Sequence, residues 1–515
     1  MRPHSSLSLS LSTVLCSLLL AACGGGGGSG GSGNGSVIVV PPPPPVSLRG
    51  KLIGNASVVP VSAGTGSVTT LDPATFKQLL EAAQKGSSAI TGTPTCAVTT
   101  YTVRYHTVGA AVEDTEASSA IMVPSGADSN CSGARPVLLY AHGTSVQKST
   151  DMANLSGTEA RLVAAMYAAQ GYIVVAPNYA GYAGSTLAYH SYLDATQQSD
   201  DMVDALRAAR LSFASIGASD SGRLLLAGYS QGGYVALATQ RAMQTKYASE
   251  FNVTAAAPMS GPYALLQFGD AIFGGAPTQG SSAFLPMLIN AAQRAGAALY
   301  TSPGDVYEAK YANGIETLLP GTSSLGELVA AGKLPNDVLF AQDSLPQAAG
   351  YSSFFGADHL VKSSYRQSYL ADLQAAPCNT SHASPLACTP AQPLRRWLLK
   401  NDLRTYVPAV PLLLCGGDQD PLVPFLNAES AAAYFNAQGK AAGTLTLLNL
   451  DGALGFDAYT GIRQQFVTAR QALRLATIVA GGDGDKAVRD AYHAGLVAPF
   501  CMRATRDFFQ SAPIR

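Results

Sequence analysis

The chain has 515 residues, of which 47% are hydrophobic and 13% are charged, and its formal net charge is -1. This composition excludes a disordered chain, and the balanced charge provides no basic surface of the kind that binds nucleic acid. The length suits one large domain with insertions or two ordinary domains.

The first 22 residues predict an export signal, because Arg2 precedes an apolar run and small residues lead to Cys23. The tetrapeptide LAAC that ends at Cys23 resembles the lipobox of bacterial lipoproteins, in which the cysteine is lipidated and becomes the mature N-terminus. The residue after Cys23 is Gly24, which resembles the pattern of lipoproteins that are sent to the outer membrane. Such a protein would face the periplasm or the outside. The alternatives are a plain signal peptide, in which Cys23 has no special role, and secretion.

Residues 23–50 predict a tether. They begin with a Gly/Ser-rich run, which is flexible, and continue with the stiff segment Pro41–Pro45. Acyl chains on Cys23 would hold the protein at a membrane surface without spanning the bilayer.

Short apolar segments alternate with helical segments over residues 96–265. The predicted strands are YTVRYHTV, ASSAIMVP, RPVLLYAHGT, YIVVAPNYAGY, RLLLAGYS and VTAAAPMSG. The predicted helices are TEARLVAAMYAAQGY, SDDMVDALRAARLSFAS and GGYVALATQRAMQ. This alternation is typical of a mostly parallel sheet that is covered by helices on both faces, an α/β fold.

Residues 266–400 break this alternation, because they read as helices and loops without clear strands. Strand patterns return at VPLLLCGGDQDPLVP and TLTLLNLDG. An insertion between strands of one sheet fits a cap or lid better than a separate domain. We therefore expect one core formed by residues 96–265 and 401–510, with residues 266–400 as its cap.

Ser230 lies at the centre of a G-x-S-x-G motif, directly between the strand RLLLA and a helix. Gly228 and Gly232 allow the sharp turn, because a side chain at either place would collide with a neighbouring strand or helix. The helix start favours an oxyanion beside the serine. Ser29 has the same motif inside the Gly/Ser-rich run, with neither strand nor helix beside it. The context therefore predicts that Ser230 is a nucleophile.

A serine hydroxyl needs a base, which is usually a histidine held by a carboxylate. In enzymes with this strand–turn–helix motif, the order along the chain is serine, acid, histidine. His359, His382 and His493 follow Ser230, and the first two lie in the predicted insertion. We therefore expect His493 to be the base.

The acid is expected just after the strand VPLLLCGG. Asp418 and Asp420 both occur there, and Asp451 ends a later strand.

An oxyanion hole needs two N–H donors. One is expected from Gln231, the residue after the nucleophile, and the other from Thr144, which follows the strand VLLYA. Gly143 allows close backbone approach, and His142 is interpreted as structural support. His190 is interpreted either as a residue at the rim of the pocket or as a hydrogen-bonded loop histidine.

Five segments occur in order, each on its expected element: YAHGT, VVAPNYAGYAGS, LLAGYSQGG, GGDQDPLVP and YHAGLVAPFC. Together they resemble the α/β-hydrolase superfamily, and within it the secretory lipases and allied bacterial esterases. The resemblance implies a central sheet, a helical lid and hydrolysis of carboxylic esters. DPLVP resembles the D-x-x-V-P segment that commonly carries the acid, which favours Asp420. In many of these enzymes the histidine soon follows the last strand, whereas here residues 459–480, which look helical, intervene.

The chain has eight cysteines, one in the export signal and one at position 23. The remaining even number in an exported chain suggests disulfides. Two cysteines lie close in sequence, two flank a predicted hairpin, and two remain by elimination, although other connectivities stay open. The expected pairs are Cys378–Cys388, Cys96–Cys131 and Cys415–Cys501. No C-x-x-C pair occurs, so we expect no structural zinc.

These features predict an enzyme that hydrolyses small-molecule or lipid esters through an acyl-enzyme, without metal or organic cofactor, and acts as a monomer. A serine peptidase or amidase of the same fold is one alternative. A peptidase that grips a free amine would need a concentrated acidic patch, and residues 266–400 carry only scattered acids. A non-catalytic surface-binding lipoprotein is another alternative, and the complete set of serine, acid and histidine candidates disfavours it.

Overall fold

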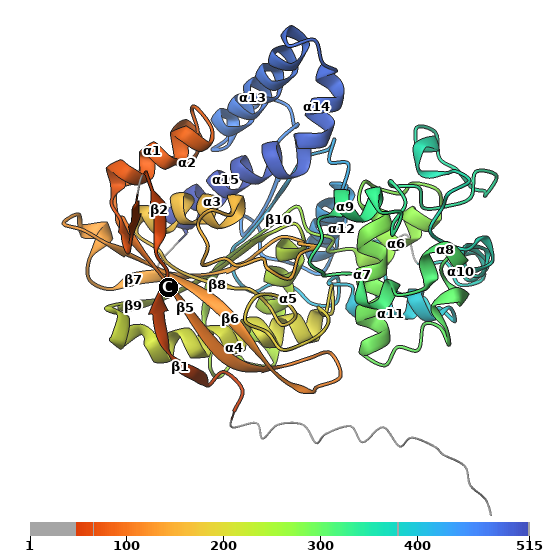
Figure 1. Cartoon of the computed structure of the whole chain (residues 1–515), viewed down its shortest axis with the longest axis horizontal. Helices are drawn as coiled ribbons and strands as arrows, with labels where there is room; N and C mark the ends of the chain where they lie inside the picture. The colour runs from red at the N-terminus through yellow and green to blue at the C-terminus, as the bar shows by residue number, and fades with distance from the viewer. Residues whose placement is uncertain (1–47, 65, 379–380, 513–515) are drawn as a thin grey trace, which may run out of the picture. The chain divides into compact units, whose positions relative to one another are not determined.

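A ten-stranded sheet runs through the centre of the structure, a computed structural model that describes residues 48–64, 66–378 and 381–512 (Figure 1). These residues belong to one unit, Pro42–Arg515. The predicted export signal, Cys23 and the tether up to residue 47 lie outside the described residues.

The sheet has the strand order β1-β5-β6-β8-β7-β9-β10-β11-β12, with β4 paired to β5. Its strands are β1 (Leu52–Val58), β4 (Thr70–Leu71), β5 (Ala97–Val108), β6 (Asp114–Ser125), β7 (Arg135–Ala141), β8 (Ile173–Pro177), β9 (Asp220–Tyr229), β10 (Val253–Met259), β11 (Leu412–Gly416) and β12 (Leu445–Asn449). Strands β7 to β12 pair in parallel, whereas β1, β4, β5 and β6 pair antiparallel. The short strands β2 (Val61–Ala63) and β3 (Gly66–Val68) form a separate hairpin.

Helices cover both faces of this sheet. Along β7, Val137 and Leu139 pack into one apolar core, while Leu138 and Tyr140 pack into the other. This is the two-residue period of a strand that is buried on both sides. The first core is closed by α4 (Ala195–Ser212) and α5 (Gln231–Thr245), and the second by α1 (Pro73–Ala83), α3 (Thr158–Met166) and α15 (Ala498–Ser511).

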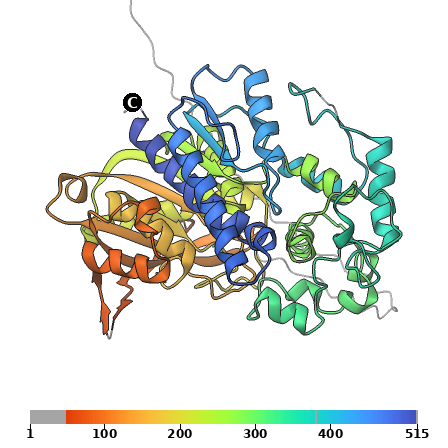
Figure 2. The ribbon, with the colours of Figure 1, turned by 90° about the horizontal axis from the view of Figure 1, so that it is seen from above.

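Between β10 and β11 the described residues form helices and loops, without a strand of the sheet. The helices are α6 (Leu265–Phe273), α7 (Ser281–Arg294), α8 (Ala309–Ala312), α9 (Leu325–Ala330), α10 (Ser363–Ala375) and α11 (Pro393–Asn401). They gather at one side of the sheet in both views (Figures 1 and 2).

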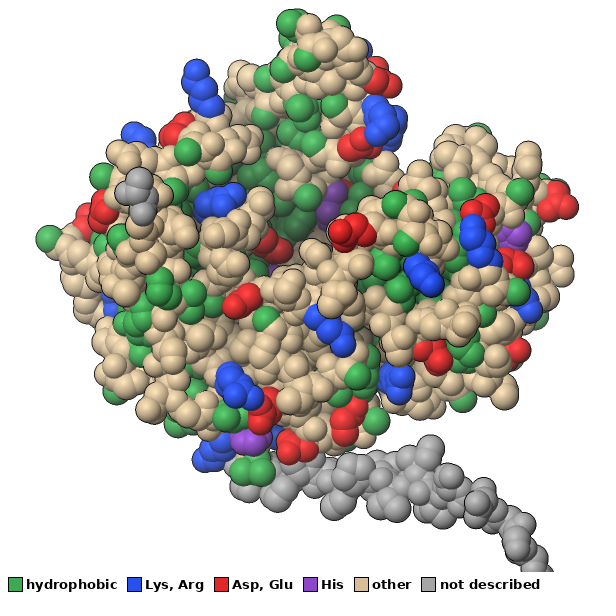
Figure 3. Space-filling view, in the orientation of Figure 1, with side chains coloured by type: hydrophobic (Ala, Val, Ile, Leu, Met, Phe, Trp, Pro, Cys, Tyr) green, Lys and Arg blue, Asp and Glu red, His purple; other side chains and the backbone are tan. Residues whose placement is uncertain are grey.

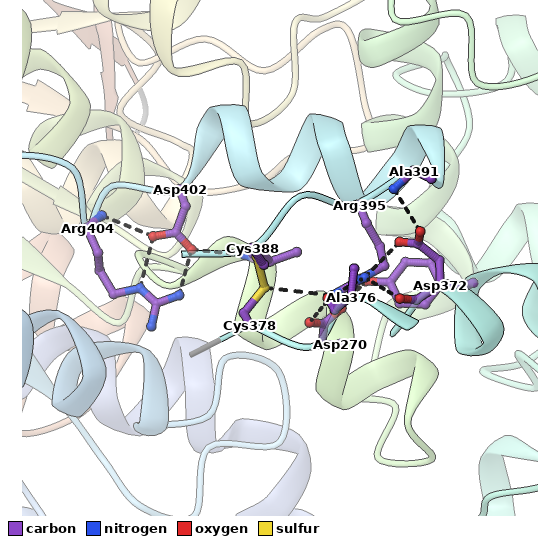
Figure 4. Close-up of a disulfide and its surroundings, with 11 residues drawn as sticks. Asp270, Asp372, Ala376, Cys378, Cys388, Ala391, Arg395, Asp402 and Arg404 are labelled. Atoms are coloured by element: carbon purple, nitrogen blue, oxygen red, sulfur yellow. Dashed lines mark hydrogen bonds and ion pairs between the residues drawn. A yellow bond between two sulfur atoms is a disulfide. The ribbon is translucent and has the colours of Figure 1, made fainter. Parts of the chain in front are cut away.

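A buried charge network ties three of these helices together beside a disulfide (Figure 4). Arg395 on α11 pairs with Asp270 on α6 at 3.0 Å and with Asp372 on α10 at 2.7 Å. Its guanidinium also donates to the Ala376 carbonyl, beside the Cys378–Cys388 bond. A buried charge is tolerated only when it is paired and hydrogen-bonded in this way.

The remaining helices are α2 (Ser88–Thr91), α12 (Leu426–Ala437), α13 (Thr460–Val479) and α14 (Gly484–Ala491). Short 3-10 turns occur at Ser129–Cys131, Ala168–Gln170, Phe213–Ile216, Pro303–Asp305, Ile315–Thr317 and Ser352–Phe354. Helices α13 and α14 form a hairpin at the top of Figure 1. This hairpin accounts for the long stretch between β12 and His493. A π-helical turn, η7 (Tyr492–Val497), then carries His493 into α15.

Three disulfides join the pairs expected from the sequence, Cys96–Cys131, Cys378–Cys388 and Cys415–Cys501. Cys415 and Cys501 are fully buried and link the end of β11 to α15. Within the described ranges, no helix is long and apolar enough to cross a bilayer.

Replacing both Cys415 and Cys501 by alanine is expected to lower the free energy of unfolding by about 2–5 kcal/mol. This bond joins residues 86 apart, so it restricts the unfolded chain strongly. The matched control replaces Cys378 and Cys388, which are only 10 residues apart. Chain entropy alone predicts a loss about 2 kcal/mol smaller for the control. Urea unfolding measures both, and equal losses would contradict the loop-length argument.

Candidate active site

Ser230 occupies a strained turn between β9 and α5. Its φ of 60° and ψ of -122° are unusual for a residue with a side chain, and such backbone costs on the order of 1–3 kcal/mol. The turn is held by a hydrogen bond of 2.9 Å from the Ser230 N–H to the carbonyl of Met259 at the end of β10. The serine is half-buried and faces a pocket.

Glycines around Ser230 allow this turn to lie against its neighbours. A Cβ on Gly232 would lie 1.9 Å from the Ala141 carbonyl oxygen, and one on Gly228 would lie 2.1 Å from the Gly232 oxygen. Gly233, which directly follows the G-x-S-x-G motif, is equally restricted, since its Cβ would lie 2.3 Å from the Met259 oxygen. Because the colliding atoms are backbone atoms, they cannot swing away.

The structure brings His493 and Asp420 together. His493 Nδ1 lies 2.6 Å from Asp420 Oδ2, and both residues are buried. Asp420 Oδ1 accepts the N–H groups of Leu422 and Val423 at 2.9 Å and 3.1 Å, so the DPLVP turn holds its own carboxylate. This arrangement fixes which histidine nitrogen faces the acid.

The two other candidate acids do not contact His493. Asp418 is exposed. Asp451 accepts hydrogen bonds from Arg470 and from the hydroxyl of Tyr492, which directly precedes His493. Asp451 therefore supports the turn that carries the histidine.

The other nitrogen of His493, Nε2, is buried without a hydrogen-bond partner in the described part of the chain. Tyr229, the residue before Ser230, connects this imidazole to the nucleophile turn. The Tyr229 hydroxyl donates to the His493 carbonyl, and the two rings lie 4.9 Å apart. Among the described residues, Ser230 Oγ and His493 Nε2 form no hydrogen bond with each other. Such bonds often form only when substrate is bound.

Thr144 and Gln231 lie beside Ser230 in the same pocket. Gln231 is the first residue of α5, so its N–H has no acceptor within the helix. The N–H of Gly143, just before Thr144, is taken by both oxygens of Glu159, at 3.0 Å and 3.1 Å. No motif in the sequence marks Glu159, because an acidic residue in the first turn of a helix is ordinary.

His142 is buried, and its ring bridges two backbone carbonyls. Nδ1 lies 2.7 Å from the Gly143 oxygen and Nε2 lies 3.1 Å from the Asn178 oxygen. These contacts agree with its interpretation as structural support.

His190 is also buried, and burial lowers its pKa to about 3. The neutral ring donates from Nδ1 to the Ala180 carbonyl at 3.0 Å and accepts at Nε2 from the Gln231 side-chain amide at 2.6 Å. Of its two interpretations, the structure therefore favours the hydrogen-bonded loop histidine. It holds the side chain of Gln231.

Comparisons with known proteins find lipases, esterases and other hydrolases among the similar proteins. Residues 147–272 match the family model of secretory lipases. The crystal structure of a ligand-bound form of the rice cell wall degrading esterase LipA from Xanthomonas oryzae is similar, with a TM-score of 0.67 and 25% identity over 90% of this chain and 100% of that chain. The chain belongs to the α/β-hydrolase superfamily. A putative hydrolase from Legionella pneumophila shares the fold at 18% identity, with a TM-score of 0.63 and the same coverage of both chains. A comparison with curated protein sequences finds no match.

The pocket of this α/β-hydrolase extends from Ser230 into the helical insertion. Most of its wall is apolar and comes from α6, α7 and α11, including Leu265, Phe268, Ile272, Phe273, Phe284, Leu285, Leu288, Leu394 and Leu398. A second, open groove shares Phe284 and Leu422 with this pocket and is lined on its other side by Lys486 and Arg489 of α14. On the face seen in Figure 3, the surface is hollowed below the α13–α14 hairpin, and hydrophobic side chains gather in the hollow. In the described residues, no group of three His, Cys, Asp or Glu side chains could hold a metal ion.

Replacing Gly232 by alanine is expected to destabilise this α/β-hydrolase by about 3 kcal/mol or more, because the new methyl group collides with the Ala141 carbonyl. The matched control is Gly461→Ala in α13, where an added Cβ meets nothing within 4 Å. That change should be neutral or stabilising by up to about 1 kcal/mol. Thermal and urea unfolding compare the two, and a Gly232→Ala protein as stable as the control would contradict the packing argument.

Proposed function

We propose that this chain hydrolyses carboxylic esters with Ser230 as nucleophile, His493 as general base and Asp420 as the acid that orients the histidine. The observation that carries the proposal is the buried Asp420–His493 pair, whose second imidazole nitrogen has no partner among the described residues, together with the strained serine turn. A histidine held by a carboxylate at one nitrogen is prepared to take a proton at the other.

The reaction follows from these positions. His493 Nε2 takes the Ser230 proton as Oγ forms a bond to the ester carbonyl carbon, and the carbonyl oxygen becomes an oxyanion held by the N–H groups of Thr144 and Gln231. The imidazolium returns its proton to the alkoxide oxygen as the ester C–O bond breaks, so an alcohol leaves. Water then attacks the acyl-enzyme by the same steps and releases a carboxylic acid and free Ser230.

The substrate is an ester with an apolar acyl group, because the pocket beside Ser230 is mainly apolar. The insertion at residues 266–400 acts as the cap that shapes this pocket. A peptidase or amidase remains the second candidate, since it would use the same three side chains. The lipase and esterase relatives support the ester.

Ser230→Ala is expected to lower ester hydrolysis by at least about 10³-fold, because the nucleophile is lost. The matched control is Ser29→Ala, which changes the other G-x-S-x-G motif and should leave the rate unaltered. The assay compares p-nitrophenyl esters of rising acyl length with an aminoacyl anilide. Each added CH₂ should improve kcat/KM up to about fourfold until the pocket is filled. Retained activity in Ser230→Ala would refute the mechanism, and anilide cleavage without ester cleavage would favour a peptidase.

We also propose that residues 1–22 direct export, that Cys23 carries acyl chains, and that residues 23–50 tether a monomeric enzyme to the outer membrane. The LAAC sequence and the Gly/Ser-rich and proline segments support this location.

Cys23→Ser in the full chain is expected to move the protein from the membrane pellet to the soluble fraction, because the acylated residue is lost. Fractionation of the producing bacteria and mass spectrometry of the mature N-terminus measure this. Wild-type protein without acyl mass, or a variant that still pellets, would argue against the anchor.

A further inference from the structure

Glu159, the second residue of α3, lies under the loop that follows β7. Both of its carboxylate oxygens accept the Gly143 N–H, and Oε1 also accepts the Tyr140 hydroxyl at 2.8 Å. A Cβ built on Gly143 would lie 3.4 Å from Glu159 Oε2 and 3.7 Å from Ser230 Cβ. The carboxylate and the nucleophile therefore both lie next to the same glycine.

Gly143 is held at both of its polar atoms. Glu159 binds its N–H, and His142 Nδ1 lies 2.7 Å from its carbonyl oxygen. That carbonyl belongs to the same planar, trans peptide as the Thr144 N–H, so the N–H points to the opposite side. Once Gly143 is fixed, the direction of the Thr144 N–H is fixed as well.

We propose that Glu159 is a positioning residue for oxyanion stabilisation, which holds Gly143 so that the Thr144 N–H is aimed before substrate binds. This inference rests on the proposed function and adds to it a carboxylate besides Asp420. Prepared donors of this kind matter most in the transition state, because they then need no reorganisation.

The groups around Glu159 influence the pKa of its carboxyl group. Burial raises its pKa above the ordinary range of glutamate, while the cationic form of His142 and the Tyr140 and Gly143 hydrogen bonds oppose that rise. The titratable groups that face it come from several elements: Tyr140 (β7), His142 (after β7), Tyr179 (after β8), Tyr229 (β9) and His493 (η7). Because the ionised carboxylate is the stronger acceptor, its contribution should be present above this pKa and lost as pH falls through it.

Glu159→Ala is expected to lower kcat for a p-nitrophenyl ester about 10- to 100-fold while KM changes less than about threefold, since loss of a whole oxyanion donor costs about 10²–10³-fold. Glu159→Gln keeps one acceptor oxygen for Gly143 but loses the charge, so its loss should be smaller, about 3- to 10-fold. The matched control is Glu116→Gln, whose carboxylate pairs with Arg104 on the neighbouring strand, and it should match wild type.

Three further readouts separate positioning from general damage. The ratio of wild-type to Glu159→Gln kcat should fall toward one as pH is lowered. The affinity for a boronic acid that forms a tetrahedral adduct should fall in step with kcat. Melting temperatures show whether each variant folds. If Glu159→Ala does not fold, the near-isosteric Glu159→Gln variant still tests the inference. Glu159 variants with kcat within twofold of wild type, or losses confined to KM, would overturn the inference.

Ser230→Ala is assayed in parallel to separate this inference from the function on which it rests. If wild-type turnover is independent of Ser230, the proposed function fails and the role of Glu159 falls with it. If turnover needs Ser230 but the Glu159 variants behave as wild type, only the role of Glu159 is refuted.

Discussion

The backbone of Gly232 lies so close to the end of β7 that a methyl group would overlap the Ala141 carbonyl oxygen. This contact brings the turn at Ser230 against the strand whose continuation carries Gly143 and Thr144. The nucleophile and the loop that faces it are therefore placed by a single backbone packing, and the strained φ of Ser230 persists because β7 and β10 hold the turn from two sides. The rest of the site is arranged around this junction.

His493 is separated from the last strand of the sheet, β12, by two helices. After β12, the α13–α14 hairpin leads away and returns, and the π-helical turn η7 then presents His493. Such turns place one extra residue per turn and are frequent at functional sites, because they re-aim a side chain. Tyr229 and Asp451 hold this turn from the sheet and from the loop after β12, so its position does not depend on the hairpin alone.

The apolar pocket depends on a different kind of support. Most of its wall comes from α6, α7 and α11, which lie in the insertion between β10 and β11. The buried Arg395 network and the adjacent disulfide join α6, α10 and α11 into one packed group, as Figure 4 shows. Charges buried in this way favour one arrangement of the helices, since any other would leave a carboxylate or guanidinium without a partner.

Local patterns in the sequence determined the alternation of strands and helices and the turn at Ser230. Both follow from contacts between near neighbours and from the absence of side chains on Gly228 and Gly232. The DPLVP segment already favoured Asp420 as the acid, and the fold brings it to His493. The support from Asp451 and the bond between His190 and Gln231 were decided only by the tertiary structure. The partners in these contacts are brought together by the fold, as with His493 and Asp420, which are 73 residues apart. The role of Glu159 could not be predicted from the sequence for the same reason. A glutamate in the first turn of a helix has an ordinary local role, and only the packing of α3 against the sheet brings it to Gly143.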